Sequence, residues 1–189
     1  EWSRPRLARY RNPYAWGQRS STAHRATVWS VVPQRGPMGR VEFEALRDLP
    51  GKVIRGDVRL APLQRDGLHL ASQDVRIEAE SAVPLRLTVI YLPLVASLRI
   101  NVDVPGVGPI CRLEVNSTDH PGAGRSHKHA LDSATCPRNN LKRNVTPRPA
   151  LEGQTMLAVW QRFCQDASIE HDGRLLCEGL DPATTVLTR

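Results

Sequence analysis

The sequence predicts an α+β fold, in which an antiparallel meander of about five strands carries one main C-terminal helix on one face. Three observations predict it. Apolar and polar residues alternate along several short segments, prolines and glycines separate some of these segments, and the apolar period becomes that of a helix near residue 156. A chain of 189 residues, of which 40% are hydrophobic, is long enough to bury one such core.

The clearest strand pattern lies in residues 97–104. Leu98 and Ile100 alternate there with Arg99 and Asn101, which is typical of a strand with one face on the core and the other in water. Similar patterns predict the other four strands, at residues 52–60, 74–80, 85–92 and 110–116.

The last predicted strand, 110–116, follows the turn sequence Pro-Gly-Val-Gly-Pro. Its alternation predicts one face on the core and one in solvent. The inward residues are Cys111, Leu113 and Val115, and the outward residues are Arg112, Glu114 and Asn116.

An apolar stripe at positions i, i+4, i+7 and i+8 predicts a helix over residues 155–168, with Thr155 as its N-cap. We expect this helix to pack on the apolar face of the sheet, with Trp160 in the core. A shorter helix or strand is expected at 174–180. The stripe consists of Met156, Trp160, Phe163 and Cys164.

The same patterns divide the chain into three parts. Residues 38–180 are expected to form a single α+β domain that begins with strands, and residues 181–189 to form a tail. Residues 1–37 scatter aromatic side chains among arginines without a strand or helix period. We interpret them as a basic, flexible arm or as a non-native extension that precedes a start at Met38.

The net charge of +7 arises in the N-terminal segment. Residues 1–40 hold eight arginines and one acidic residue, which leaves 18 of the 26 basic and 18 of the 19 acidic residues for the rest of the chain. Because that remainder is formally neutral, the total charge does not by itself indicate a nucleic-acid-binding domain.

Several protein classes find no support in the sequence. No apolar run reaches the roughly 18 residues of a membrane span and no secretory signal is recognisable, so we expect a cytoplasmic protein without a membrane partner. The four cysteines form no Cys-x-x-Cys pair. The motifs of P-loop ATPases, dinucleotide enzymes, serine hydrolases and zincins are absent.

Residues 119–129 form the segment with the most reactive side chains. They hold three of the six histidines, His120, His127 and His129, just after the last strand of the predicted meander. A proline and two glycines between the first histidine and the other two predict a reversal that returns the pair toward the first. If the pair is extended, His127 and His129 share one face and Lys128 lies on the other.

One chemistry that suits this loop is acid–base cleavage of a phosphodiester, which requires no cofactor. His120, His127 and His129 would take and give protons. Arg125 and Lys128 would stabilise the charge on the scissile phosphate.

A second chemistry is metal binding. His120, His127 and His129 would bind one divalent ion such as zinc, with the thiolate of Cys136 as a fourth ligand and Asp119 as an alternative to the first histidine.

Two simpler interpretations stay open. Arg125, Ser126 and Lys128 would suffice to bind a phosphate or another anion together with the glycine-rich backbone. Alternatively, the histidines are solvated residues of an ordinary surface loop.

A basic run follows the histidine loop. Residues 137–149 contain no acidic residue, and their position next to the loop would let them guide RNA or another polyanion to it. Taken alone, such a run is also typical of a solvated surface. The predicted nucleic-acid contacts are Arg138, Lys142 and Arg143.

Residues 104–113, followed by Asp119-His120 and by the Gly-x-x-His-x-His segment at residues 124–129, resemble the strand and histidine segment of small, functionally uncharacterised bacterial proteins. The resemblance covers about residues 41–170. It implies a bacterial origin and brings no activity and no catalytic residue with it.

The sequence thus leads to two hypotheses about function. The first is a small bacterial nucleic-acid-processing protein, a toxin-like RNase or phosphodiesterase that uses the loop histidines; a protein partner such as an antitoxin is not identified by the sequence. The alternative is a non-enzymatic binding or accessory protein, whose histidine loop is structural or holds a single metal ion. Both a catalytic and a metal role require the three imidazoles to lie close together.

Overall fold

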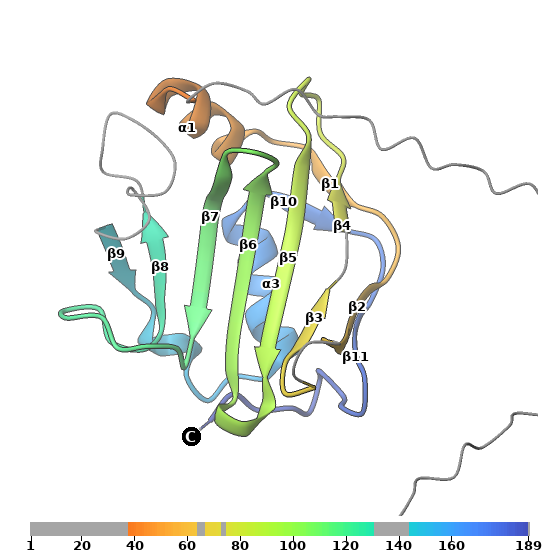
Figure 1. Cartoon of the computed structure of the whole chain (residues 1–189), viewed down its shortest axis with the longest axis vertical. Coiled ribbons are helices and arrows are strands. Elements are labelled where there is room, and N and C mark those ends of the chain that lie inside the picture. Colours follow the sequence, from red (N-terminus) through yellow and green to blue (C-terminus); the bar gives the residue numbers. More distant parts are fainter. Residues whose placement is uncertain (1–37, 64–66, 73–74, 131–143, 189) are drawn as a thin grey trace, which may run out of the picture. The chain divides into compact units, whose positions relative to one another are not determined.

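The computed structural model describes residues 38–63, 67–72, 75–130 and 144–188. They form an α+β fold dominated by strands, with a nine-stranded, largely antiparallel sheet, a two-stranded sheet and two α-helices within the described ranges. Figure 1 shows the longer helix, α3 (Met156–Asp166), behind the large sheet. No helix in this part of the chain is long and apolar enough to cross a membrane.

The large sheet has eight strands in a row and a ninth beside them. In order across the sheet they are β11 (Leu175–Cys177), β2 (Val58–Pro62), β3 (Leu70–Ser72), β5 (Leu85–Leu92), β6 (Ser97–Val104), β7 (Gly108–Val115), β8 (His127–Ala130) and β9 (Asn144–Pro147). The ninth, β4 (Val75–Ile77), pairs with β5. Neighbours are antiparallel except β11 and β2, which are parallel.

The small sheet joins two distant parts of the chain. It consists of β1 (Lys52–Ile54) and β10 (Ile169–His171), which pair in parallel. Two short 3₁₀ helices, Pro93–Val95 and Pro149–Leu151, complete the regular elements that the structure describes.

The centre of the predicted meander is confirmed. The strands expected at 85–92 and 97–104 have those bounds, and the strand expected at 110–116 is β7. The expected total of about five strands is wrong. Residues 52–60 form two strands instead of one, and the segment 74–80 contributes only the three residues of β4. Most of the additional strands have three or four residues, which is too short for a periodic pattern.

The core lies between the sheet and α3, as predicted. Leu98, Ile100, Val102 and Val104 of β6 are each about 1% exposed or less. The predicted stripe of α3 is buried, and the Oγ1 of its N-cap Thr155 accepts a hydrogen bond from the backbone N–H of Ala158 at 3.2 Å. Trp160 lies in the core, where its Nε1–H donates to Nδ1 of His171 at 3.1 Å.

The expectation that the domain begins with strands from Met38 onward is wrong, because residues 40–48 form helix α1 (Arg40–Asp48). Phe43 and Leu46, three residues apart, are its buried side chains. The ammonium group of Lys52, itself buried, donates to the carbonyls of Arg47 and Leu49 at the end of this helix. Over so short a segment, the alternation of Val41 and Phe43 with Glu42 and Glu44 also fits a strand, so the sequence pattern did not distinguish the two.

Residues 181–188 do not form the expected tail but pack against the rest of the domain. Leu187 is fully buried, and its backbone N–H and carbonyl bond to Gln154 and Gly153. The side-chain amide of Asn116 also donates to the Leu187 carbonyl at 2.9 Å. The sequence did not reveal this packing because the segment's two buried residues, Pro182 and Leu187, show no strand or helix period.

Gly173 provides a test of the contact that brings β1 and β10 together. The turn at residues 55–57 is held to this region by Asp172, which accepts hydrogen bonds from the N–H of Gly56 and the guanidinium of Arg55. A Cβ on Gly173 would collide with the backbone carbonyl of Gly56. Gly173→Ala is therefore expected to lower the free energy of unfolding by about 1–3 kcal/mol, measured by urea denaturation.

The matched control is Gly39→Ala. Gly39 has an ordinary φ of −72°, and a Cβ added there would meet no other atom within 4 Å, so the loss should stay below about 1 kcal/mol. Equal losses in the two variants would contradict the close contact at Gly173.

Candidate metal centre

Strand pairing places two histidines opposite a glutamate and an arginine. In the antiparallel pair β7–β8, His127 lies opposite Glu114 and His129 lies opposite Arg112. These residues occupy the face of the sheet that lies away from α3. The predicted sharing of one face by His127 and His129 is thus confirmed. Lys128 pairs with the core residue Leu113 and lies on the other face.

The loop between β7 and β8 folds back on itself and returns His120 to the pair. The backbone N–H of Ser117 donates to the carbonyl of Arg125 at 3.0 Å, which closes the base of the loop. Farther out, His120 and Gly124 exchange backbone hydrogen bonds of 2.9 and 3.1 Å. Gly124 has a φ of 70°, a left-handed conformation that favours glycine in this reversal. The reversal expected from the sequence is present.

The three imidazoles form one compact cluster. Ring centroids lie 4.4 Å apart for His120 and His127, 4.9 Å for His127 and His129, and 5.5 Å for His120 and His129. With a carboxylate oxygen of Glu114, each of the four residues offers one ligand atom, and these atoms all lie within 4.8 Å of one another. The cluster is buried apart from His120, which is half-buried.

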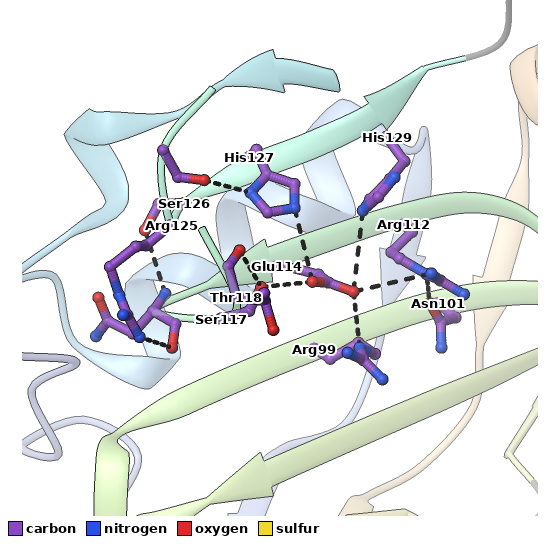
Figure 2. Close-up of polar contacts among 12 residues, drawn as sticks. Arg99, Asn101, Arg112, Glu114, Ser117, Thr118, Arg125, Ser126, His127 and His129 are labelled. Carbon is purple, nitrogen blue, oxygen red and sulfur yellow. Dashed lines mark hydrogen bonds and ion pairs between the residues drawn. The ribbon is translucent and has the colours of Figure 1, made fainter. Parts of the chain in front are cut away.

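Glu114 is the member of the cluster that the sequence did not reveal. Its outward orientation on β7 is as predicted, but its side chain is only 4% exposed instead of solvated. Figure 2 shows it between the histidines of β8 on one side and Arg99 and Arg112 on the other. Its Oε1 lies 2.8 Å from Nε of Arg99 and 3.8 Å from Nη1 of Arg112.

The other carboxylate oxygen, Oε2, faces His127. It accepts a hydrogen bond from the hydroxyl of Ser117 and lies 3.6 Å from Nε2 of His127. Nδ1 of His127 lies 3.0 Å from the carbonyl of Gly124. Because a carbonyl can only accept, Nδ1 carries the proton, and in the neutral ring Nε2 presents its lone pair to the carboxylate. This Nε2 is buried without a hydrogen-bond partner in the described part of the chain.

The protonation states of these groups suit metal binding. Burial holds the pKa of His127 below its ordinary value, against the opposing effects of the Gly124 carbonyl and Glu114. Burial alone would raise the pKa of Glu114, but the Ser117 hydroxyl and the charge of Arg99 outweigh it and lower the pKa. A neutral imidazole and an ionised carboxylate therefore face each other at neutral pH, and these are the forms that bind metal ions.

Two of the spacings are close to those around one shared ion, whereas the four ligand atoms as a set lie within 4.8 Å, so a bound ion would draw them closer together. Two ligand atoms that each lie about 2.1 Å from a tetrahedral zinc ion are about 3.4 Å apart. The two carboxylate oxygens of Glu114 lie 3.6 Å from Nε2 of His127 and 3.9 Å from Nε2 of His129. Both distances are too long for hydrogen bonds and close to the spacing of two ligands on one ion.

The other residues predicted for this loop do not join the cluster. Arg125 is half-buried, and its Nη2 donates to the carbonyl of Asn116 at 3.1 Å. Ser126 is buried, and its hydroxyl accepts from the backbone N–H of Asn116. Since Lys128 lies on the opposite face, the predicted anion site of Arg125, Ser126 and Lys128 is not assembled. Asp119 is exposed. Outside the described residues lie Cys136, Arg138, Lys142 and Arg143.

A depression of about 490 Å³ adjoins the cluster on the same face of the sheet. Arg99 and Ser117 line it, and both also contact Glu114. A small molecule in this depression would therefore touch residues that touch the cluster.

Comparison with known proteins does not place the chain in a family. It has no match among family models, curated proteins or solved structures. The resemblance to small bacterial proteins therefore lends no support to any function, and the geometry of the site is the basis for assigning one.

The pKa of His127 predicts how the metal-free protein responds to acid. Below pH 6.5 the imidazole of His127 gains a proton in the unfolded chain but stays neutral in the folded chain, where its pKa is lower. Its contribution to the free energy of unfolding is therefore complete above pH 6.5 and is lost as the pH drops toward the folded pKa. The lowered pKa of Glu114 adds a loss below pH 4.5. Urea unfolding in EDTA between about pH 7.5 and 5.0 should show a steeper loss of stability for the wild type than for His127→Gln. Parallel pH profiles would contradict the lowered pKa.

Proposed function

We propose that this protein binds one divalent transition-metal ion, zinc being the simplest candidate, through His120, His127, His129 and Glu114. The observation that carries the proposal is the pair formed by Nε2 of His127 and Oε2 of Glu114. Two electron-pair donors face each other 3.6 Å apart in a buried site, and a neutral imidazole has no proton there to join them. A cation between them would turn this unfavourable contact into a stabilising one.

The donor set supports a first-row ion. Imidazole nitrogens suit zinc, copper, iron and nickel, and a single carboxylate is compatible with all of them. A four-coordinate zinc ion would be enclosed by the protein ligands, as in structural sites. An ion that takes five or six ligands would keep positions for water or a small ligand, and the half-buried side of the site at His120 would admit one.

The fixed orientation of His127 supports the same proposal. A metal-binding histidine usually donates its second ring N–H to a carbonyl or carboxylate, which sets the tautomer. The bond from Nδ1 of His127 to the Gly124 carbonyl is of this kind. Ser117 in the same way holds one oxygen of Glu114.

Acid–base cleavage of RNA is supported less well by the same cluster. A general acid or base must come within hydrogen-bond distance of the substrate, directly or through one water. The side chain of His127 is 0% exposed, and the predicted phosphate-stabilising Lys128 lies on the opposite face. This hypothesis remains a separate prediction that experiment can distinguish.

Metal binding is tested on the full chain after removal of metal with EDTA and addition of Zn²⁺. We expect one zinc ion per chain by elemental analysis. Zinc should also raise the free energy of unfolding, by about 2.7 kcal/mol when the free zinc concentration is about 100 times the dissociation constant. Glu114→Gln and His120→Ala should each weaken zinc binding by at least about 100-fold, because loss of even an outer partner costs about 10- to 100-fold.

The matched controls are Glu152→Gln and His69→Ala, which change the same residue types outside the cluster and should leave zinc affinity unchanged. Since His120 is half-buried, its variant is the one expected to fold with least disturbance. Tight, stoichiometric zinc binding by both cluster variants would overturn the proposal, as would the absence of zinc binding by the folded wild type.

An RNA-cleavage assay separates the metal centre from the acid–base hypothesis. With the full chain, we expect no cleavage that persists in EDTA. Cleavage that survives EDTA and disappears in His127→Ala would instead support metal-free acid–base catalysis by the histidines.

A further inference from the structure

With a metal ion bound, the positive charge around the cluster would favour binding of an anion. Arg99 and Arg112 both lie within 4 Å of Oε1 of Glu114, so two positive charges surround one negative charge. With neutral imidazoles and a divalent ion, the formal charge of the site rises to about +3. Such an excess in a largely buried place attracts an anionic ligand, and the neighbouring depression offers room for one.

Arg99 connects the cluster with the neighbouring depression. Its Nε lies 2.8 Å from Glu114, whereas 45% of its side chain is exposed and it lines the depression. Within the described part of the chain, Glu114 is the residue that Arg99 pairs with. Its two terminal amino groups therefore remain available for a carboxylate, which an arginine binds through two parallel hydrogen bonds.

The lining of the depression is mixed: three apolar side chains stand among polar ones, which include the carboxylate of Asp119. Ile90, Leu92 and Val95, from the end of β5 and the following 3₁₀ helix, line it together with Arg99. A volume of about 490 Å³ lies within the range of about 300–1,000 Å³ typical of small-molecule sites. An inorganic anion would leave these three apolar side chains without a partner, whereas an organic acid would cover them.

We propose that the depression binds a small organic carboxylate with an apolar chain, whose head group pairs with Arg99, the residue that also contacts Glu114, and whose chain packs on Ile90, Leu92 and Val95. This inference rests on the proposed metal centre and deepens it by assigning the class of its ligand. Arg99 is then a specificity-determining residue that pairs with the head group.

The test uses the full chain loaded with zinc, with metal content measured on the same sample. Isothermal titration with acetate and hexanoate should show at least about 10-fold tighter binding of hexanoate, because part of its four additional methylenes leaves water. Arg99→Gln should weaken hexanoate binding about 10-fold or more, and Arg99→Lys should recover part of the loss. Leu92→Ser should reduce the preference for hexanoate and leave acetate binding as it is.

The control variant is Arg76→Gln, an exposed arginine of β4 outside the depression, which should bind hexanoate like the wild type. EDTA-treated protein should bind hexanoate at least about 10-fold more weakly than the zinc-loaded protein. Inorganic phosphate serves as the competing probe and should bind more weakly than hexanoate.

The outcomes separate this inference from the metal centre itself. A protein that retains zinc but binds acetate and hexanoate equally, or phosphate more tightly than either, would overturn the assignment of an organic carboxylate. Hexanoate binding that is unchanged in Arg99→Gln would overturn the role of Arg99. A protein that fails to hold zinc would instead overturn the proposed metal centre, and elemental analysis reveals that before any titration.

Discussion

The register between β7 and β8 is the constraint on which the rest of the site depends. It places His127 opposite Glu114 and His129 opposite Arg112. Since side chains alternate along a strand, a slip of one residue would move both histidines to the core face and bring Lys128 out in their place. The hydrogen bonds at the base of the intervening loop help to prevent this slip, because they fix where β8 begins.

The loop that sets this register is itself held by distant parts of the chain. Asn116 adopts a φ of 52° at the end of β7, and its side-chain amide donates to the carbonyls of Ala96 and Leu187. The C-terminal segment is in turn fixed by the buried side chain of Leu187. The candidate site thus rests on the β5–β6 connection and on the C-terminus as well as on the strands that carry its ligands.

A buried carboxylate gives the site its electrostatic character. Glu114 stays ionised because Ser117 and Arg99 compensate for its removal from water. The oxygen that accepts from Ser117 also faces His127, whose imidazole burial keeps neutral by lowering its pKa. A metal ion would satisfy these donors, and the surplus positive charge that results would favour an anionic ligand near Arg99. The histidine cluster and the depression are therefore linked through Arg99 and Ser117, which contact Glu114 and also line the depression.

The sequence by itself determined the central strands, the C-terminal helix with its Thr155 cap, and the common face of His127 and His129, because each depends on local periodicity or local turn chemistry. It also determined that Glu114 points away from the core. Only the tertiary structure decided that this glutamate is buried among the histidines, since that follows from the pairing of two strands separated by a long loop. The short strands and the packing of Leu187 likewise depend on contacts between distant segments, and the nine residues of helix α1 are too few for their pattern to exclude a strand.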